Sequence, residues 1–134
     1  MLEELLIDFN KKHSIPYEFI QEASGDYYFL EISPEFRIEM RPIEEEGKPK
    51  GIFLRANLFL LLDPDRETLF RKLLEANYLY QTTMGFALGM DPNERYITLS
   101  AYIYSEIDKN SFWYTLEHFC NAIDFLRHNF EKKS

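Results

Sequence analysis

Residues 63–104, DPDRETLFRKLLEANYLYQTTMGFALGMDPNERYITLSAYIY, decide the fold, because they encode a predicted helix followed closely by two predicted strands. Asp63 is suited to the N-cap of a helix, and Pro64 fits the first helical position, where its missing N–H is not needed. The helix is expected to run to about Tyr80. The rest of the chain is then interpreted as support or binding surface for this segment.

The predicted helix has a wide apolar face. At about 100° per residue, an arc of roughly 160° holds Leu69, Phe70, Leu73, Leu74, Ala76, Asn77 and Tyr80. A helix that covers a core needs a stripe of only about 100°. Two interpretations are open: the arc contacts both the chain's own sheet and a second surface, or the whole arc lies in the core.

Two apolar segments after this helix predict an antiparallel hairpin. Residues 84–89 form a short candidate strand with glycine near both ends, and the turn sequence Asp91-Pro92-Asn93-Glu94 follows. Residues 95–104 then alternate between an apolar face and an aromatic or polar face, with Ile97, Leu99, Ala101 and Ile103 on the apolar side. Such alternation is typical of a strand with one face in the core.

The remaining segments complete a predicted α+β domain that spans residues 1–134. Leu2, Leu5, Leu6 and Phe9 have helical spacing, and Phe112, Leu116, Phe119, Ile123, Leu126 and Phe130 continue such a stripe in a last helix that starts near Asp108. Strands are predicted at residues 27–32, 36–41 and 52–61, with a charged loop at 44–51. The order is therefore helix, three strands, helix, two strands, helix. We expect a twisted antiparallel sheet packed with helices, and packing of the last helix on that sheet is favoured over a coiled-coil seam.

Composition excludes several classes of partner. The net charge of −8 argues against nucleic acid, whose phosphates need a basic face, and against an anionic membrane surface. No apolar run is long enough to span a bilayer, and the acidic N-terminus does not fit a signal peptide. With one cysteine, no internal disulfide can form. A bacterial cytoplasmic location is the expectation.

The sequence holds no recognisable catalytic or metal-binding motif. His118 and His128 are ten residues apart, too far for a zinc-binding pair on one helix face, and His13 ends the first helix. Cys120 lies about 200° around the helix from His118, so it is expected to be a buried inert thiol. We therefore predict no enzyme activity, cofactor or metal site.

Three short segments together resemble the core signature of a known family. LLEANYL at 73–79, GFALGMDP at 85–92 and YITLS at 96–100 match, in order and spacing, the pattern of the class I (Tir-chaperone-like) effector chaperones of bacterial type III secretion. The resemblance covers residues 52–130 well, and the first fifty residues match only in layout.

This resemblance implies a homodimer without catalytic activity, ATP site, cofactor or metal. The N-terminal segment of one or more effector proteins would wrap around the dimer in extended form and stay soluble and secretion-competent. Such a segment can also add a strand to the sheet edge. Components of the secretion apparatus are further candidate partners.

The resemblance also assigns residues to two candidate surfaces, and for each residue the alternative is a place in the core. The dimer candidates are Phe70, Leu74, Tyr78, Tyr80, Met84, Phe86 and Leu88. The effector-binding candidates are Leu2, Leu5, Phe9, Tyr28, Leu30, Ile32, Phe36, Ile38 and Phe53.

Two other functions are weighed against this one. The first is a YbjN-like regulatory or binding protein with the same fold but no link to secretion. The second is a small enzyme with an aromatic pocket, which would need convergent polar residues in a concave site.

Overall fold

The chain is built around an antiparallel sheet of six strands in the order β1-β2-β3-β4-β6-β5. It is seen in a computed structural model that describes residues 2–33, 36–61, 66–78, 85–104 and 109–130. The strands are β1 (Tyr17–Ile20), β2 (Tyr27–Ser33), β3 (Phe36–Glu45), β4 (Lys48–Leu60), β5 (Ala87–Met90) and β6 (Tyr96–Tyr104). The helices are α1 (Leu2–His13), α2 (Arg66–Asn77) and α3 (Lys109–Phe130).

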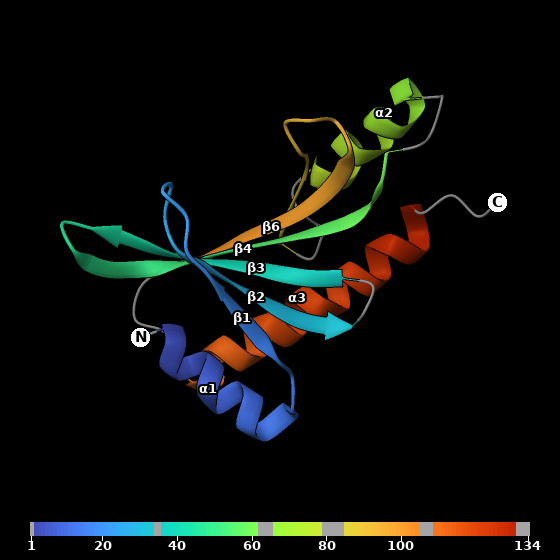
Figure 1. The fold of residues 1–134 in the computed structure, drawn as a ribbon. Helices are drawn as coiled ribbons and strands as arrows, with labels where there is room; N and C mark the ends of the chain where they lie inside the picture. The colour runs from blue at the N-terminus through green and yellow to red at the C-terminus, as the bar shows by residue number, and fades with distance from the viewer. Residues whose placement is uncertain (1, 34–35, 62–65, 79–84, 105–108, 131–134) are drawn as a thin grey trace.

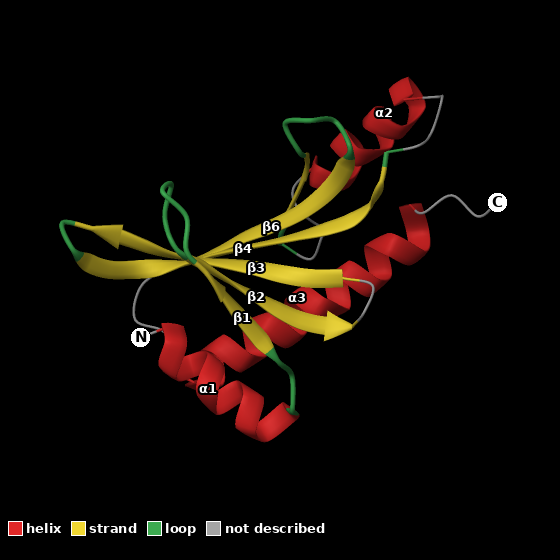
Figure 2. Cartoon of the chain, viewed as in Figure 1, coloured by secondary structure: helices red, strands yellow, loops and turns green. Residues whose placement is uncertain are grey.

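The helices are not spread evenly around the sheet. Figure 1 and Figure 2 show α1 and α3 on the same side of it, whereas α2 lies beyond the end where β4 finishes and β6 begins. Side chains that alternate along the central strands, such as Ile38, Leu54 and Leu99, are fully buried beneath the helices. The expected stripe of α3 completes this core, because Phe112, Leu116, Phe119, Ile123 and Leu126 are buried as well. Sheet packing of this helix is thereby confirmed.

The α+β class is confirmed, but the predicted order lacks one strand. β1 was not predicted, because its four residues lie between Pro16 and a turn and carry no long alternation. It forms only through its neighbour, with Tyr17 opposite Leu30 and Ile20 opposite Tyr27. A strand this short depends on such cross-strand pairing.

The predicted charged loop at residues 44–51 is wrong. β3 continues to Glu45, β4 begins at Lys48, and the two are joined by a two-residue turn. Glu46 and Gly47 adopt φ angles of 53° and 77°, which is the left-handed conformation of a tight hairpin turn. The charged residues correctly indicated a segment exposed to solvent. Its main chain nevertheless forms a ladder of hydrogen bonds, so the segment is a hairpin, which projects from the sheet in Figure 1.

The hairpin of β5 and β6 is present as expected. Its turn is closed by a hydrogen bond from the N–H of Glu94 to the carbonyl of Asp91. The Asp91 carboxylate also accepts hydrogen bonds from the N–H groups of Arg95 and Tyr96, at 2.6 and 2.9 Å. These bonds, that of Tyr96 most of all, lower the pKa of Asp91. The expected helix starts at Asp63 and Asp108 lie outside the described residues.

Candidate partner-binding surfaces

Helix α2 carries two apolar stripes side by side, and only one of them is covered. Leu69, Leu73 and Ala76 are buried against the subunit's own core. Phe70, Leu74 and Tyr78 follow one another at intervals of four residues, so they share a neighbouring face. We call these three residues the α2 stripe. Phe70 is half-buried, but Leu74 and Tyr78 are 71% and 73% exposed. The predicted arc is therefore not simply core, and its outer half is an apolar surface.

An asparagine that the sequence placed in the apolar arc fixes this helix to the sheet. The side-chain amide of Asn77 donates a hydrogen bond to the carbonyl of Leu88 at 3.0 Å, and its oxygen accepts one from the N–H of Leu88 at 2.8 Å. β5 is an edge strand, whose outward main-chain groups need partners. The Asn77 side chain thus makes the two hydrogen bonds that a further strand would make with Leu88. These bonds fix the position of the helix that carries the α2 stripe. Its polarity within an apolar arc was the only sequence signal of this role.

The other dimer candidates divide into two groups. Phe86 and Leu88 are buried within the subunit, and the Phe86 ring lies 5.1 Å from Phe119. They have almost no exposed area in the single subunit, which favours the alternative of a place in the core. Tyr80 and Met84 lie outside the described residues. Met90, which the sequence did not single out, is exposed on β5.

The effector-binding candidates on α1 are also core residues. Leu2, Leu5 and Phe9 are buried, because the helix packs its apolar stripe against the sheet and α3. Lys12 completes this contact by placing its ammonium 3.8 Å from the ring centre of Trp113. Only Ile7, which was not predicted, presents a large exposed apolar side chain on this helix.

The free edge of the sheet carries an aromatic cluster. Phe19 on β1 is 46% exposed and packs 4.9 Å from Tyr28 on β2, which is also 6.1 Å from Tyr17. β1 has a neighbour on one side only. Its outer main-chain groups are therefore a place where an extended peptide could pair. The sequence identified Tyr28 but missed Phe19, because it missed β1.

The remaining effector-binding candidates lie on both faces of the sheet. Leu30 and Ile38 are fully buried under the helices, which favours the alternative of a place in the core. Strand periodicity shows which side chains share a face but not what covers that face. Ile32 and Phe36 are half-buried. Phe53 lies on the face without helices, where it packs 4.7 Å from the exposed ring of Tyr102.

The described part of the chain offers little for catalysis. It contains no cluster of three or more His, Cys, Asp or Glu side chains able to hold a metal ion. Burial raises the pKa of the Cys120 thiol to about 11, which keeps it protonated and unreactive at neutral pH. The His118 ring is stacked with Tyr114 at 6.3 Å and lies 5.2 Å from the tilted ring of Phe86. No helix in these residues is long and apolar enough to cross a bilayer.

Comparison with known proteins agrees with this architecture. Residues 25–127 match the Tir chaperone protein (CesT) family. Among curated proteins, none matches the chain in sequence.

Solved structures with the same fold include three complexes. The ExsC–ExsE complex has 15% identity and a TM-score of 0.70, covering 99% of this chain and 96% of that one. For the HopA1–SchA chaperone–effector complex the identity is 15% and the TM-score 0.65, covering 98% and 94%. The ExoU–SpcU complex from the type III secretion system of Pseudomonas aeruginosa has 15% identity and a TM-score of 0.53, covering 93% and 97%.

Proposed function

Because the chain belongs to the Tir chaperone protein (CesT) family, a family of type III secretion chaperones rather than enzymes, we propose that it binds the N-terminal segment of one or more effectors as a homodimer in the bacterial cytoplasm. Binding keeps that segment soluble and competent for secretion. The mechanism is stoichiometric, so no residue has to perform chemistry.

The observation that carries the dimer is the α2 stripe. Leu74 and Tyr78 are large apolar side chains that the subunit leaves in water, next to a helix face that it fully covers. Soluble monomers rarely leave such a patch uncovered without a functional reason. In a two-fold dimer the stripe of one subunit contacts the same surface of the other. Both copies of each side chain are therefore buried.

Two further features support an extended client. The edge of β1 offers unpaired main-chain groups, and Phe19 and Tyr28 lie beside them as sites for apolar side chains. A client that is otherwise unfolded must be ordered on binding, and this cost requires a large contact surface. An edge strand with neighbouring aromatic side chains supplies both main-chain and side-chain contacts.

Co-expression with a candidate effector from the same bacterium tests the proposal. We expect the effector to be insoluble alone and to form a soluble complex with two copies of this 16.1 kDa chain. Phe19→Asp should weaken the complex, whereas the control Glu18→Asp, on the same strand but with an unchanged charge, should not. The proposal fails if every effector tested stays insoluble in the presence of the chain.

The dimer is tested separately by Leu74→Glu, which should give monomers in light scattering. Lys72→Glu is the matched control, because it adds negative charge at an exposed position of α2 outside the stripe. A dimer that survives Leu74→Glu as well as it survives the control would place the interface elsewhere.

A further inference from the structure

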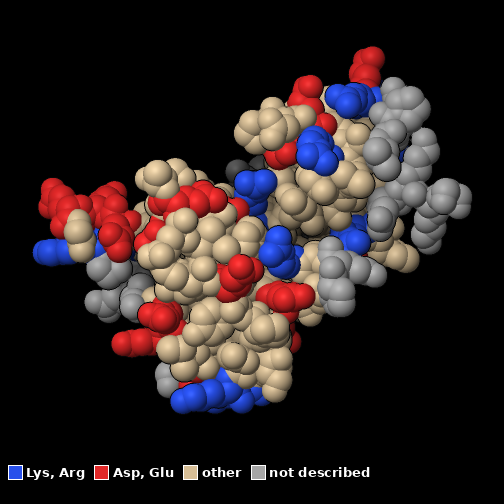
Figure 3. Space-filling model, in the orientation of Figure 1, with Lys and Arg blue, Asp and Glu red and all other residues tan. Residues whose placement is uncertain are grey.

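The face of the sheet opposite α1 and α3 carries none of the described helices, and its side chains are unusual for so acidic a chain. Strand residues that alternate with the core residues project here, among them Phe29, Arg37 and Arg55. Figure 3 shows basic side chains over the region of β3, β4 and β6, with acidic side chains beside them and more acidic ones at the tip of the β3–β4 hairpin. Basic side chains are therefore exposed on this face although the net charge of the chain is −8.

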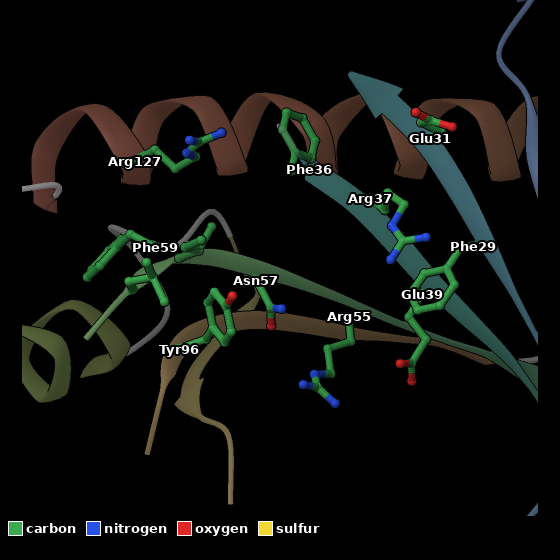
Figure 4. A pocket seen from close by; sticks show the side chains of 12 residues that line it. Phe29, Glu31, Phe36, Arg37, Glu39, Arg55, Asn57, Phe59, Tyr96 and Arg127 are labelled. Carbon is green, nitrogen blue, oxygen red and sulfur yellow. The ribbon is translucent and has the colours of Figure 1, made fainter. Parts of the chain in front are cut away.

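A cavity of about 670 Å³ opens on this face and reaches past the sheet to α3, since its lining includes Arg127 as well as Arg37 and Arg55. Figure 4 shows Arg37, Arg55 and Arg127 spaced around it, from β3, β4 and α3 respectively. Aromatic side chains form much of the wall, including Phe29, Phe36 and Tyr96. The cavity is comparable in size to sites that hold small ligands or a few peptide side chains.

Two of the guanidinium groups lie over aromatic rings. The Cζ of Arg37 is 4.2 Å from the ring centre of Phe29, and that of Arg127 is 5.7 Å from the ring centre of Phe36. Stacking of this kind holds the guanidinium plane while leaving its edge able to donate hydrogen bonds, and two parallel N–H donors match a carboxylate. The aromatic rings of the cavity wall thus hold the two guanidinium groups in place, so little side-chain entropy is lost when these groups bind a ligand.

The carboxylates near the cavity engage its cations only in part: the Arg37 guanidinium forms an ion pair of 3.9 Å with Glu18, in which both side chains are more than half exposed. Glu39 is engaged by Arg41, which lies outside the lining residues, through an ion pair of 2.7 Å. Glu31 faces Arg37 across the strand pair. Among the described residues no carboxylate lies within salt-bridge distance of Arg55. The lining residues comprise three arginines and two glutamates, so the site keeps a positive balance and suits an anionic partner.

A second copy of this chain does not fit that requirement. A two-fold contact sets each patch against itself, which would bring the arginines of one subunit against those of the other. The described residues that line the cavity include no thiol, imidazole or aliphatic hydroxyl, so the groups present suit binding rather than nucleophilic catalysis. This weighs against the enzyme alternative, although the concave site it requires exists.

We propose that this cavity binds an acidic, aromatic-containing stretch of the client, with carboxylates on Arg37 and Arg55 and an aromatic side chain against the phenylalanine wall. The inference rests on the proposed chaperone function and adds a second, charge-selective contact to the apolar edge at β1. It would let the chaperone distinguish clients by acidic residues rather than by apolar content alone.

The test uses a fluorescent peptide that alternates glutamate and phenylalanine, with a matched peptide in which glutamine replaces glutamate. The acidic peptide should bind at least about tenfold more tightly, because each charge-assisted hydrogen bond contributes the equivalent of about a tenfold change. Arg55→Gln and Arg37→Gln should each lower its affinity about tenfold. Arg71→Gln, on exposed α2, should leave it unchanged, and thermal melting checks that every variant is folded.

Three results would overturn the inference. One is equal binding of the acidic and amide peptides, and another is an equal loss with Arg71→Gln, which would indicate non-specific charge. The third is tighter binding of a single-stranded oligodeoxythymidine, since stacked arginines and rings also suit nucleic acid. If the cognate effector still forms a soluble complex with Arg55→Gln at wild-type affinity, only this subsite is refuted. Failure of the wild-type chain to hold any effector refutes the proposed function itself.

Discussion

Replacing Leu74 by alanine should weaken the dimer without unfolding the subunit. The side chain is 71% exposed in the single chain, and full burial of a leucine contributes about 1.5–3 kcal/mol. Covering the exposed part therefore contributes about 1–2 kcal/mol per subunit, or about 2–4 kcal/mol per two-fold dimer. At about 1.4 kcal/mol per factor of ten, the dissociation constant should rise by about 30- to 1000-fold. Folding should change by less than about 0.5 kcal/mol, as for other exposed sites.

The neighbouring residue provides the matched control. Leu73 has the same side chain on the same helix but is only 8% exposed, so Leu73→Ala should cost about 2–5 kcal/mol of folding free energy. Sedimentation equilibrium over a dilution series measures the dimer, and urea unfolding at a concentration where monomer dominates measures the fold. An unchanged dimer constant for Leu74→Ala would refute the reasoning. Equal loss of folding stability in both variants would show that the stripe is part of the core.

The remaining predictions concern the fold around this surface and the thiol. Asn77→Ala should cost about 1–3 kcal/mol of folding free energy, because two hydrogen bonds to Leu88 are lost. Hydrogen exchange at the Leu88 amide should then become faster. Unchanged exchange there would contradict the anchoring role of Asn77. The lowered pKa of Asp91 means that its carboxylate stabilises the fold above its usual pKa of 3.8 and that this contribution is lost as the pH falls toward the folded-state pKa. Asp91→Asn should therefore flatten the acid side of the stability curve in urea melts, and a curve parallel to wild type would count against it. With a pKa of about 11, Cys120 should react slowly with a disulfide reagent at about pH 8 and quickly once unfolded, whereas rapid reaction of the folded chain would show an accessible thiolate.

Local pattern was enough to predict most of the elements. The spacing of Leu2, Leu5 and Phe9 predicted a helix, and the alternation through Ile97 and Leu99 predicted a strand. Both predictions succeed because the spacing of apolar residues along the chain follows the period of the helix or strand. The three short motifs also predicted the family. These signals survive in the sequence because each depends only on neighbours along the chain.

Segments that are held mainly by main-chain pairing, without an apolar pattern of their own, were missed. β1 has four residues and no pattern of its own, and the β3–β4 hairpin at Glu46-Gly47 is too charged to suggest strands. Both are held by main-chain hydrogen bonds to a neighbouring strand, to which every residue type except proline can contribute its N–H. The aromatic edge at Phe19 was lost with β1.

The sequence by itself determined the α+β class, the order of nearly all elements, the acidic character and the resemblance to a chaperone family. Only the tertiary structure decided which apolar residues stay exposed. Leu73 and Leu74 are identical neighbours in one arc, yet the sheet covers the first and leaves the second in water. Likewise, arginines from β3, β4 and α3 meet at one cavity although they are far apart in the chain. Periodicity records that a side chain is apolar and which side it is on, whereas burial depends on what the rest of the fold places against that side.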